Sequence, residues 1–135
     1  MQPNTQTAGN ARKRILAGGI ISALPVLFLL FDAGAKIVKV APAVEGSTQL
    51  GYPESVIAGI GVTLLVCTIL CAIPRTSILG AILLTGYLGG AVATHVRVGN
   101  PLFSHVLFPV YVGVLIWGGL CLREERLRAL LPLRR

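Results

Sequence analysis

Charged side chains are scarce in this chain of 135 residues. Asp, Glu, Lys and Arg make up 13% of it, and only five residues are acidic. A soluble domain usually carries about a quarter charged residues, whereas this chain is 54% hydrophobic and has a mean hydropathy of +0.79. The scarcity of charge therefore excludes an ordinary soluble domain and favours a protein that lies in a membrane.

Motifs that specify a reaction are also missing. The chain has no nucleophile elbow, no pair of carboxylates at a fixed spacing and no local metal-ligand spacing. Cys67, Cys71 and Cys121 do not have the CxxC spacing of thiol redox proteins. We expect them to be reduced, buried, small hydrophobic residues, with a quinone-linked thiol relay as the alternative. The sequence specifies no cofactor and no metal, and it leaves open whether the protein is an enzyme.

Four long apolar runs carry no Asp, Glu, Lys or Arg: Ile15–Phe31, Val56–Ile73, Ile78–Thr94 and Val106–Leu122. Each approaches the ~20 apolar residues that an α-helix needs to cross a bilayer. The sequence therefore predicts an all-α integral membrane protein, a four-helix bundle that runs up, down, up and down. We expect a polar, flexible tail over residues 1–11 and one transmembrane domain over 12–135. Its spans are expected at about 15–37, 54–73, 77–95 and 102–122.

The basic residues sort to one side of these spans. Nine fall on one side and three, Lys36, Lys39 and Arg97, on the other. Because cytoplasmic loops are rich in Lys and Arg, both termini are predicted to be cytoplasmic in a multi-pass protein of the cell (inner) membrane. A cleavable signal peptide is the alternative for the first span, but its apolar run exceeds the usual ~7–15 residues of such a peptide.

A net charge of +7 raises the question of a nucleic-acid partner. The basic residues flank apolar spans, and no basic face interleaved with aromatics exists to stack bases. We therefore expect no nucleic acid and membrane lipids as partners, with anionic headgroups near the Arg-rich C-terminus.

The third span is rich in small residues, and Gly86 and Gly90 have GxxxG spacing. Such a stripe allows close backbone packing between helices in lipid. We expect it to pack within the bundle, and a homodimer seam is the alternative.

Ionisable residues gather at one predicted level, near the outer ends of the spans. Asp32 follows Arg14 by 18 residues and His95 follows Ser77 by 18, which places both about 27 Å from the inner boundary. Asp32 and Lys36 are spaced to form an ion pair. Such groups at membrane depth suggest a functional cleft, although they can also be merely interfacial. The candidate ligand-binding residues are Asp32, Lys36, Glu54, Tyr87, Thr94, His95, Arg97 and His105.

If the protein catalyses a reaction, the candidate catalytic residues are His95, Asp32 and Arg97. An imidazole can donate or accept a proton near neutral pH, so His95 is the strongest of the three. Arg97 could hold an anion, and Asp32 could orient Lys36 or His95.

A family resemblance rests mainly on residues 73–76 (IPRT) and 79–97 (LGAILLTGYLGGAVATHVR). These runs resemble the signature of the DoxX-like family of small four-span bacterial membrane proteins. Phe31-Asp32 with Lys36, Leu50-Gly51-Tyr52-Pro53 and Trp117 before Leu122-Arg123 are also similar to that family. Its members often carry a Glu in the second span, where this chain reads Gly61-Val62-Thr63-Leu64-Leu65.

The resemblance implies either a membrane subunit associated with sulfur or quinone redox enzymes or a chaperone for other membrane proteins. Together with the residues, it leaves two hypotheses. The first is a protein that binds a small amphiphilic molecule or a membrane partner through an outer polar cleft. The second is a redox-associated membrane subunit or small membrane enzyme that acts on a quinone-like or other lipophilic substrate, with His95 in proton transfer.

Overall fold

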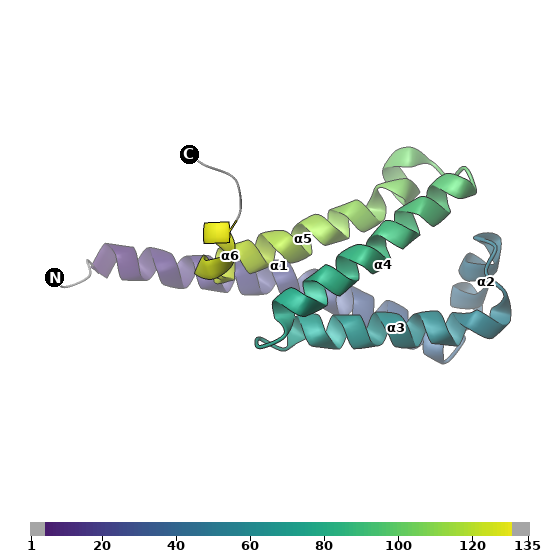
Figure 1. Ribbon diagram of the computed structural model, residues 1–135, viewed down its shortest axis with the longest axis horizontal. Coiled ribbons are helices and arrows are strands. Elements are labelled where there is room, and N and C mark those ends of the chain that lie inside the picture. The colour runs from purple at the N-terminus through teal and green to yellow at the C-terminus, as the bar shows by residue number, and fades with distance from the viewer. Residues whose placement is uncertain (1–4, 131–135) are drawn as a thin grey trace.

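Four long helices form most of the structure (Figure 1). The computed structural model describes residues 5–130 of the chain. The long helices are α1 (Thr5–Ile37), α3 (Glu54–Ala72), α4 (Ser77–Arg97) and α5 (Phe108–Arg123). The shorter elements are α2 (Ala41–Gln49), the π-helical turn η1 (Leu102–Val106) and α6 (Glu125–Leu130). Residues 5–130 contain no strand, so the all-α prediction is confirmed.

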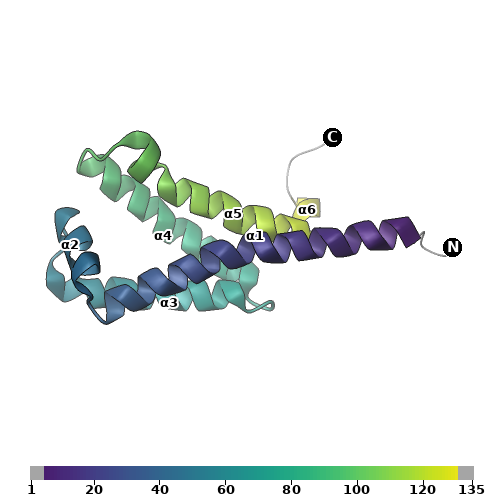
Figure 2. The same ribbon diagram turned by 180° about the vertical axis from the view of Figure 1, so that it is seen from behind.

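The long helices form a ring in which each contacts two others. Helix α1 packs against α3 and α5, and α4 packs against the same two, so α1 and α4 lie diagonally opposite each other. Successive long helices run in opposite directions (Figures 1 and 2). This is the predicted up-down-up-down bundle. Its two ends differ: α2 and η1 lie at one end, called here the α2 end, and the N-terminal part of α1 projects beyond the other.

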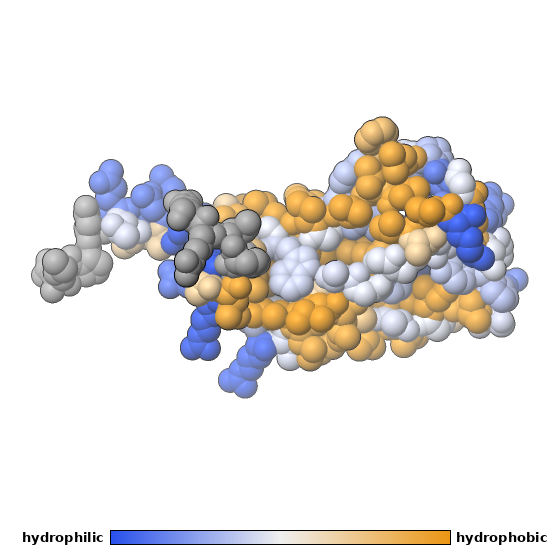
Figure 3. Space-filling view, turned by 45° about the horizontal axis from the view of Figure 1, so that its top comes forward, coloured by the Kyte–Doolittle hydropathy of each residue, from blue (hydrophilic) through white to orange (hydrophobic). Residues whose placement is uncertain are grey.

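The outer surface of the bundle is apolar over the length of the helices. Each of the four predicted spans lies in a helix that is long and apolar enough to cross a membrane. Large hydrophobic side chains point outward, among them Leu24 at 63% exposure and Phe31 at 78%. Hydrophobic residues cover the middle of the face in Figure 3, and hydrophilic residues gather at its two ends. The chain is therefore a multi-pass membrane protein.

Glycines set the closest helix contacts. A Cβ at Gly18 of α1 would lie 2.7 Å from the carbonyl oxygen of Gly119 in α5. A Cβ at Gly61 of α3 would lie 2.9 Å from the carbonyl oxygen of Ala33 in α1, and a Cβ at Gly80 of α4 would lie even closer to the backbone of Cys71 in α3. These approaches leave no room for a side chain, which is how helices pack closely in lipid.

Gly86 and Gly90 do not contribute such contacts, and the prediction that they pack within the bundle is wrong. A Cβ built at either residue meets no atom within 4 Å. Both glycines instead line a pocket. A stripe of small residues has the same sequence pattern whether it faces a neighbouring helix or an open space.

The ends of the elements also differ from the sequence expectation. Helix α1 begins at Thr5, so residues 5–11 are helical rather than a flexible tail, because extending a long helix by about two more turns costs little once it is nucleated. Residues 1–4 of that tail, and Arg134 and Arg135, lie outside the described residues. The segment between the first and second predicted spans contains α2, and the fourth span divides into η1 and α5, whose first turn holds Pro109.

Candidate functional site

A pocket of about 480 Å³ lies inside the bundle at the α2 end. It occupies the space between the diagonal helices α1 and α4, and all four long helices line it. We call it the main pocket. Its walls are Phe28, Leu29, Asp32 and Lys36 of α1, Ser47 of α2, Leu50 and Tyr52 of the following turn, Ile60 of α3, Gly86, Tyr87, Leu88, Gly90, Ala91, Thr94 and His95 of α4, and Phe108, Pro109 and Val112 of α5.

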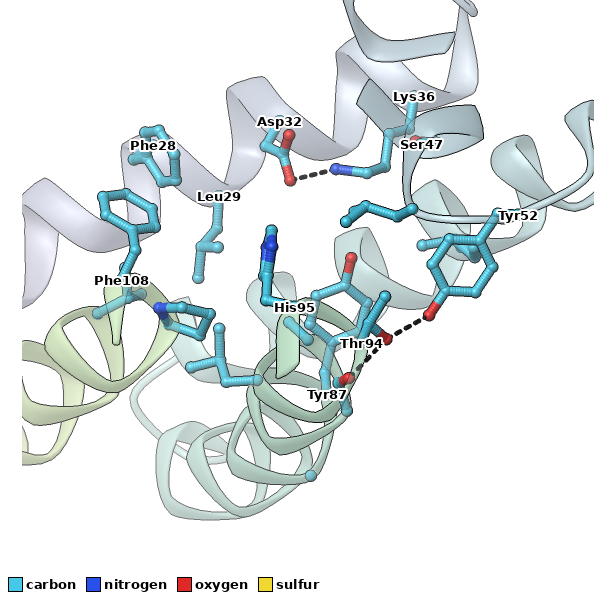
Figure 4. A pocket seen from close by; sticks show the side chains of 18 residues that line it. Phe28, Leu29, Asp32, Lys36, Ser47, Tyr52, Tyr87, Thr94, His95 and Phe108 are labelled. Atoms are coloured by element: carbon cyan, nitrogen blue, oxygen red, sulfur yellow. Dashed lines mark hydrogen bonds and ion pairs between the residues drawn. The ribbon is translucent and has the colours of Figure 1, made fainter. Parts of the chain in front are cut away.

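One side of the main pocket is apolar. Leu29, Leu88 and Val112 belong to the hydrophobic core of the bundle and are almost fully buried. The rings of Phe28 and Phe108 meet edge to face, with centroids 5.5 Å apart, and join α1 to α5 (Figure 4). Such ring pairs add to the stabilisation from burial. This side therefore presents hydrocarbon to any molecule inside.

The other side carries an ion pair on α1. The ammonium Nζ of Lys36 donates to Oδ2 of Asp32 at 2.5 Å, one helical turn away. The Lys36 side chain is 17% exposed and that of Asp32 35%, so the pair is partly withdrawn from solvent. The predicted ion pair is confirmed. Its two charges cancel, which lowers the cost of placing ionisable groups at membrane depth.

His95 approaches this pair from the opposite helix. Asp32 and His95 point into the same space between α1 and α4 (Figure 4). The amide Nδ2 of Asn100 donates to Nδ1 of His95 at 2.7 Å. Because Nδ1 accepts that bond, Nε2 carries the hydrogen of the neutral imidazole. His95, which lines the pocket, therefore has an N–H donor that the bond to Asn100 does not use.

The segment after α2 closes over the pocket. The phenol of Tyr52 and the hydroxyl of Thr94 are hydrogen bonded at 2.8 Å, and Thr94 also donates to the carbonyl of Gly90 (Figure 4). A guanidinium nitrogen of Arg97 donates to the carbonyl of Leu50 at 2.6 Å. These long-range bonds tie the turn after α2 to α4.

Five of the eight residues proposed from the sequence line the main pocket: Asp32, Lys36, Tyr87, Thr94 and His95. The other three do not. Glu54 begins α3 with an exposed side chain, Arg97 holds the Leu50 carbonyl, and exposed His105 contacts His95 from outside, with ring centroids 5.9 Å apart. All three belong to elements at the α2 end of the bundle (Figure 1), but counting residues along a helix could not tell which of its sides faces inward.

Sequence reasoning missed several residues of the pocket. Tyr52 was noted only within the family-like run 50–53, and Phe28 and Phe108 look like ordinary lipid-facing aromatics in their apolar runs. Phe28 lies one helical turn before Asp32, and this spacing is the one local signal that connects it with the polar cluster.

The cysteines lie away from the site. All three are free thiols, and none lines the main pocket. Cys67 and Cys71 are buried in the core, as expected for small hydrophobic residues. Within residues 5–130, no group of three or more His, Cys, Asp or Glu side chains is arranged to hold a metal ion.

Comparison with known proteins gives one match. No curated protein and no solved structure is significantly similar to the chain. Residues 20–119 match the model of the DoxX-like family, and this range covers most of the chain and every residue of the main pocket. The chain therefore belongs to the DoxX-like family of membrane proteins.

Proposed function

We propose that this protein binds a small amphiphilic molecule in the main pocket. The observation that carries the proposal is the division of that pocket into a polar and an apolar side. Asp32, Lys36 and His95 supply the polar side, and Leu29, Val112 and the aromatic pair supply the other. The volume of about 480 Å³ lies within the usual ~300–1,000 Å³ of small-molecule sites.

The polar side favours a headgroup with hydrogen-bond acceptors and no net charge. Lys36 uses one of its three N–H donors on Asp32, and His95 offers its Nε2–H. Because Asp32 already balances Lys36, a charged headgroup would leave an unpaired charge in a site of low polarity. Hydroxyl, carbonyl or zwitterionic headgroups meet this condition.

The geometry also argues against a purely structural role for these groups. An ion pair needed only for stability could be replaced by apolar packing at little cost. Here the pair borders a pocket instead of packed side chains, and the Cβ positions of Gly86 and Gly90 on the facing helix are open.

The experiment compares molecules that co-purify with four forms of the protein in mild detergent, identified by native mass spectrometry. Gly90→Leu fills the main pocket from a position with open space, and His95→Ala removes the polar donor. Gly118→Leu is the matched control, because Gly118 also has open space around its Cβ position but lies outside this pocket.

Wild type and Gly118→Leu should retain a small amphiphile. Gly90→Leu and His95→Ala should lose it by about tenfold or more, equivalent to roughly 1.4 kcal/mol of binding free energy. Folded yield should be similar for all four proteins. Retention by Gly90→Leu at the wild-type level would contradict the proposal, and loss of a bound protein instead of a small molecule would identify the site as a surface for a membrane partner.

The second candidate function is a redox-associated subunit or membrane enzyme in which His95 exchanges protons with a lipophilic substrate. The His95–His105 contact favours it, because His105 is exposed while His95 lines the pocket. A pair of imidazoles at this spacing can connect a pocket with solvent through one water. For this function, His105→Ala should leave ligand retention unchanged and slow only proton uptake or release during turnover. An unaltered pH–rate profile in this variant would exclude proton transfer through His105.

A further inference from the structure

A second, smaller pocket adjoins the main pocket on the lipid side of α4 and α5. It has a volume of about 340 Å³, and its lining includes Thr85, Leu88, Gly89, Pro109, Gly113 and Trp117. We call it the side groove. Leu88 and Pro109 line both spaces, so these two side chains form the partition between them.

The side groove offers no free hydrogen-bonding group. Its hydroxyl belongs to Thr85, which donates to the carbonyl of Ala81 at 2.7 Å and accepts the indole N–H of Trp117 at 2.8 Å. The other lining side chains are apolar. A polar ligand would find no partner here, whereas a hydrocarbon chain loses nothing by entering.

Two glycines create the space. A Cβ at Gly89 would meet no atom within 4 Å, and one at Gly113 would meet only Leu88 Cδ1 at 3.7 Å. A larger residue at Gly89 would therefore fill the groove. The Leu88 side chain is 8% exposed and lines both spaces, so a tail that passes from one to the other requires a change of its rotamer.

We infer that the bound molecule is a long-chain amphiphile whose headgroup lies in the main pocket and whose tail passes Leu88 into the side groove. This inference rests on the proposed function and adds the chain length of the ligand. The two spaces are adjacent and share Leu88 and Pro109 as walls, and the free polar groups line only the first; these observations carry the inference. In a bilayer a tail gains little from burial alone, so the groove fixes the tail by shape.

Trp117 provides a direct test because it is the only tryptophan of the chain and lines the side groove. The full-length protein would be placed in nanodiscs of unbrominated lipid. Dibrominated octadecanol serves as the long probe and bromohexanol as the short one, since bromine quenches a nearby indole. Quenching of Trp117 fluorescence reports the position of the tail, and native mass spectrometry reports retention of either probe.

Two matched variants on α4 distinguish the role of the side groove from that of the main pocket. Gly89→Leu fills the side groove, and Gly86→Leu fills the main pocket; both residues have open space at the Cβ position. The long probe should quench wild-type Trp117 saturably, and excess unbrominated octadecanol should reverse the quenching. Gly89→Leu should abolish this quenching and weaken retention of the long probe about fivefold or more, while the short probe is retained as in wild type. Gly86→Leu should lose both probes.

Other results overturn the inference. Quenching that rises linearly with probe, or persists in Gly89→Leu, means that the tail lies in bulk lipid. A wild-type dimer that Gly89→Leu converts to monomers means that a second copy of the chain occupies the groove. Equal retention of both probes by wild type and Gly89→Leu, with loss in Gly86→Leu, overturns the tail path and leaves the proposed function standing. If the wild-type protein retains neither probe, the tail path and the proposed function are both wrong.

Discussion

Tyr52 and Thr94, 42 residues apart in the chain, share a hydrogen bond of 2.8 Å at the edge of the main pocket. Tyr52 lies in the turn after α2, and Thr94 lies near the end of α4. Together with the bond from Arg97 to the Leu50 carbonyl, this contact holds the turn against α4. The turn is therefore fastened over the pocket by side chains.

Replacing Tyr52 with Phe should loosen this cover. The variant keeps the ring and loses one hydrogen bond, worth about 0.5–1.5 kcal/mol. Amide hydrogen exchange over residues 47–52 should speed up by roughly three- to tenfold, since local opening needs correspondingly less free energy. Tyr111→Phe is the control, because Tyr111 also donates one hydrogen bond, to Phe103, away from the pocket. Equal exchange in wild type and Tyr52→Phe would show that the bond does not hold the turn.

Breaking the ion pair from one side should destabilise the bundle. Asp32→Ala leaves the Lys36 ammonium unpaired at 17% exposure, and we expect a loss of about 1–3 kcal/mol in the free energy of unfolding. Adding Lys36→Met should recover part of that loss, which a denaturation titration in detergent would measure. Glu125→Ala removes an exposed pair with Arg128 at 3.7 Å and should cost less than about 0.5 kcal/mol. If Asp32→Ala costs no more than Glu125→Ala, the Asp32–Lys36 pair is only interfacial.

Adjacent glycines of α1 should respond oppositely to alanine. A Cβ at Gly18 would lie 2.7 Å from the Gly119 carbonyl oxygen, so Gly18→Ala should force α1 and α5 apart at a cost of about 1–3 kcal/mol. A Cβ at Gly19 meets nothing within 4 Å, so Gly19→Ala should be neutral or stabilising by up to about 1 kcal/mol. Thermal unfolding of the two variants measures the difference. Similar melting temperatures would mean that α1 and α5 pack less closely here.

Both termini are predicted to be cytoplasmic. A reporter active only in the cytoplasm should work when fused after Arg135, and one active only outside should work when inserted at Gly46 of α2, which is exposed with open space around it. The excess of Lys and Arg at the terminal side of the spans is the physical reason. The reverse pattern of reporter activity would invert the topology and place the main pocket at the cytoplasmic side.

Local composition was enough to predict the four spans, because an uncharged run of about twenty residues has few alternatives to a membrane helix. It also predicted the Asp32–Lys36 pair, whose members lie one turn apart on a single helix. The level of the polar cluster followed from counting residues along each helix.

Only the tertiary structure decided which of these groups meet. Rotation and placement of each helix depend on packing between residues far apart in the chain, as in Gly18 against Gly119. That packing leaves α1 and α4 on a diagonal, turns Gly86 and Gly90 toward a pocket, and brings Tyr52 to Thr94, while His105 stays outside. Periodicity along one helix carries no information about the angle at which a neighbouring helix faces it. The sequence alone therefore determined the four spans, and the packing of the helices determined the pocket.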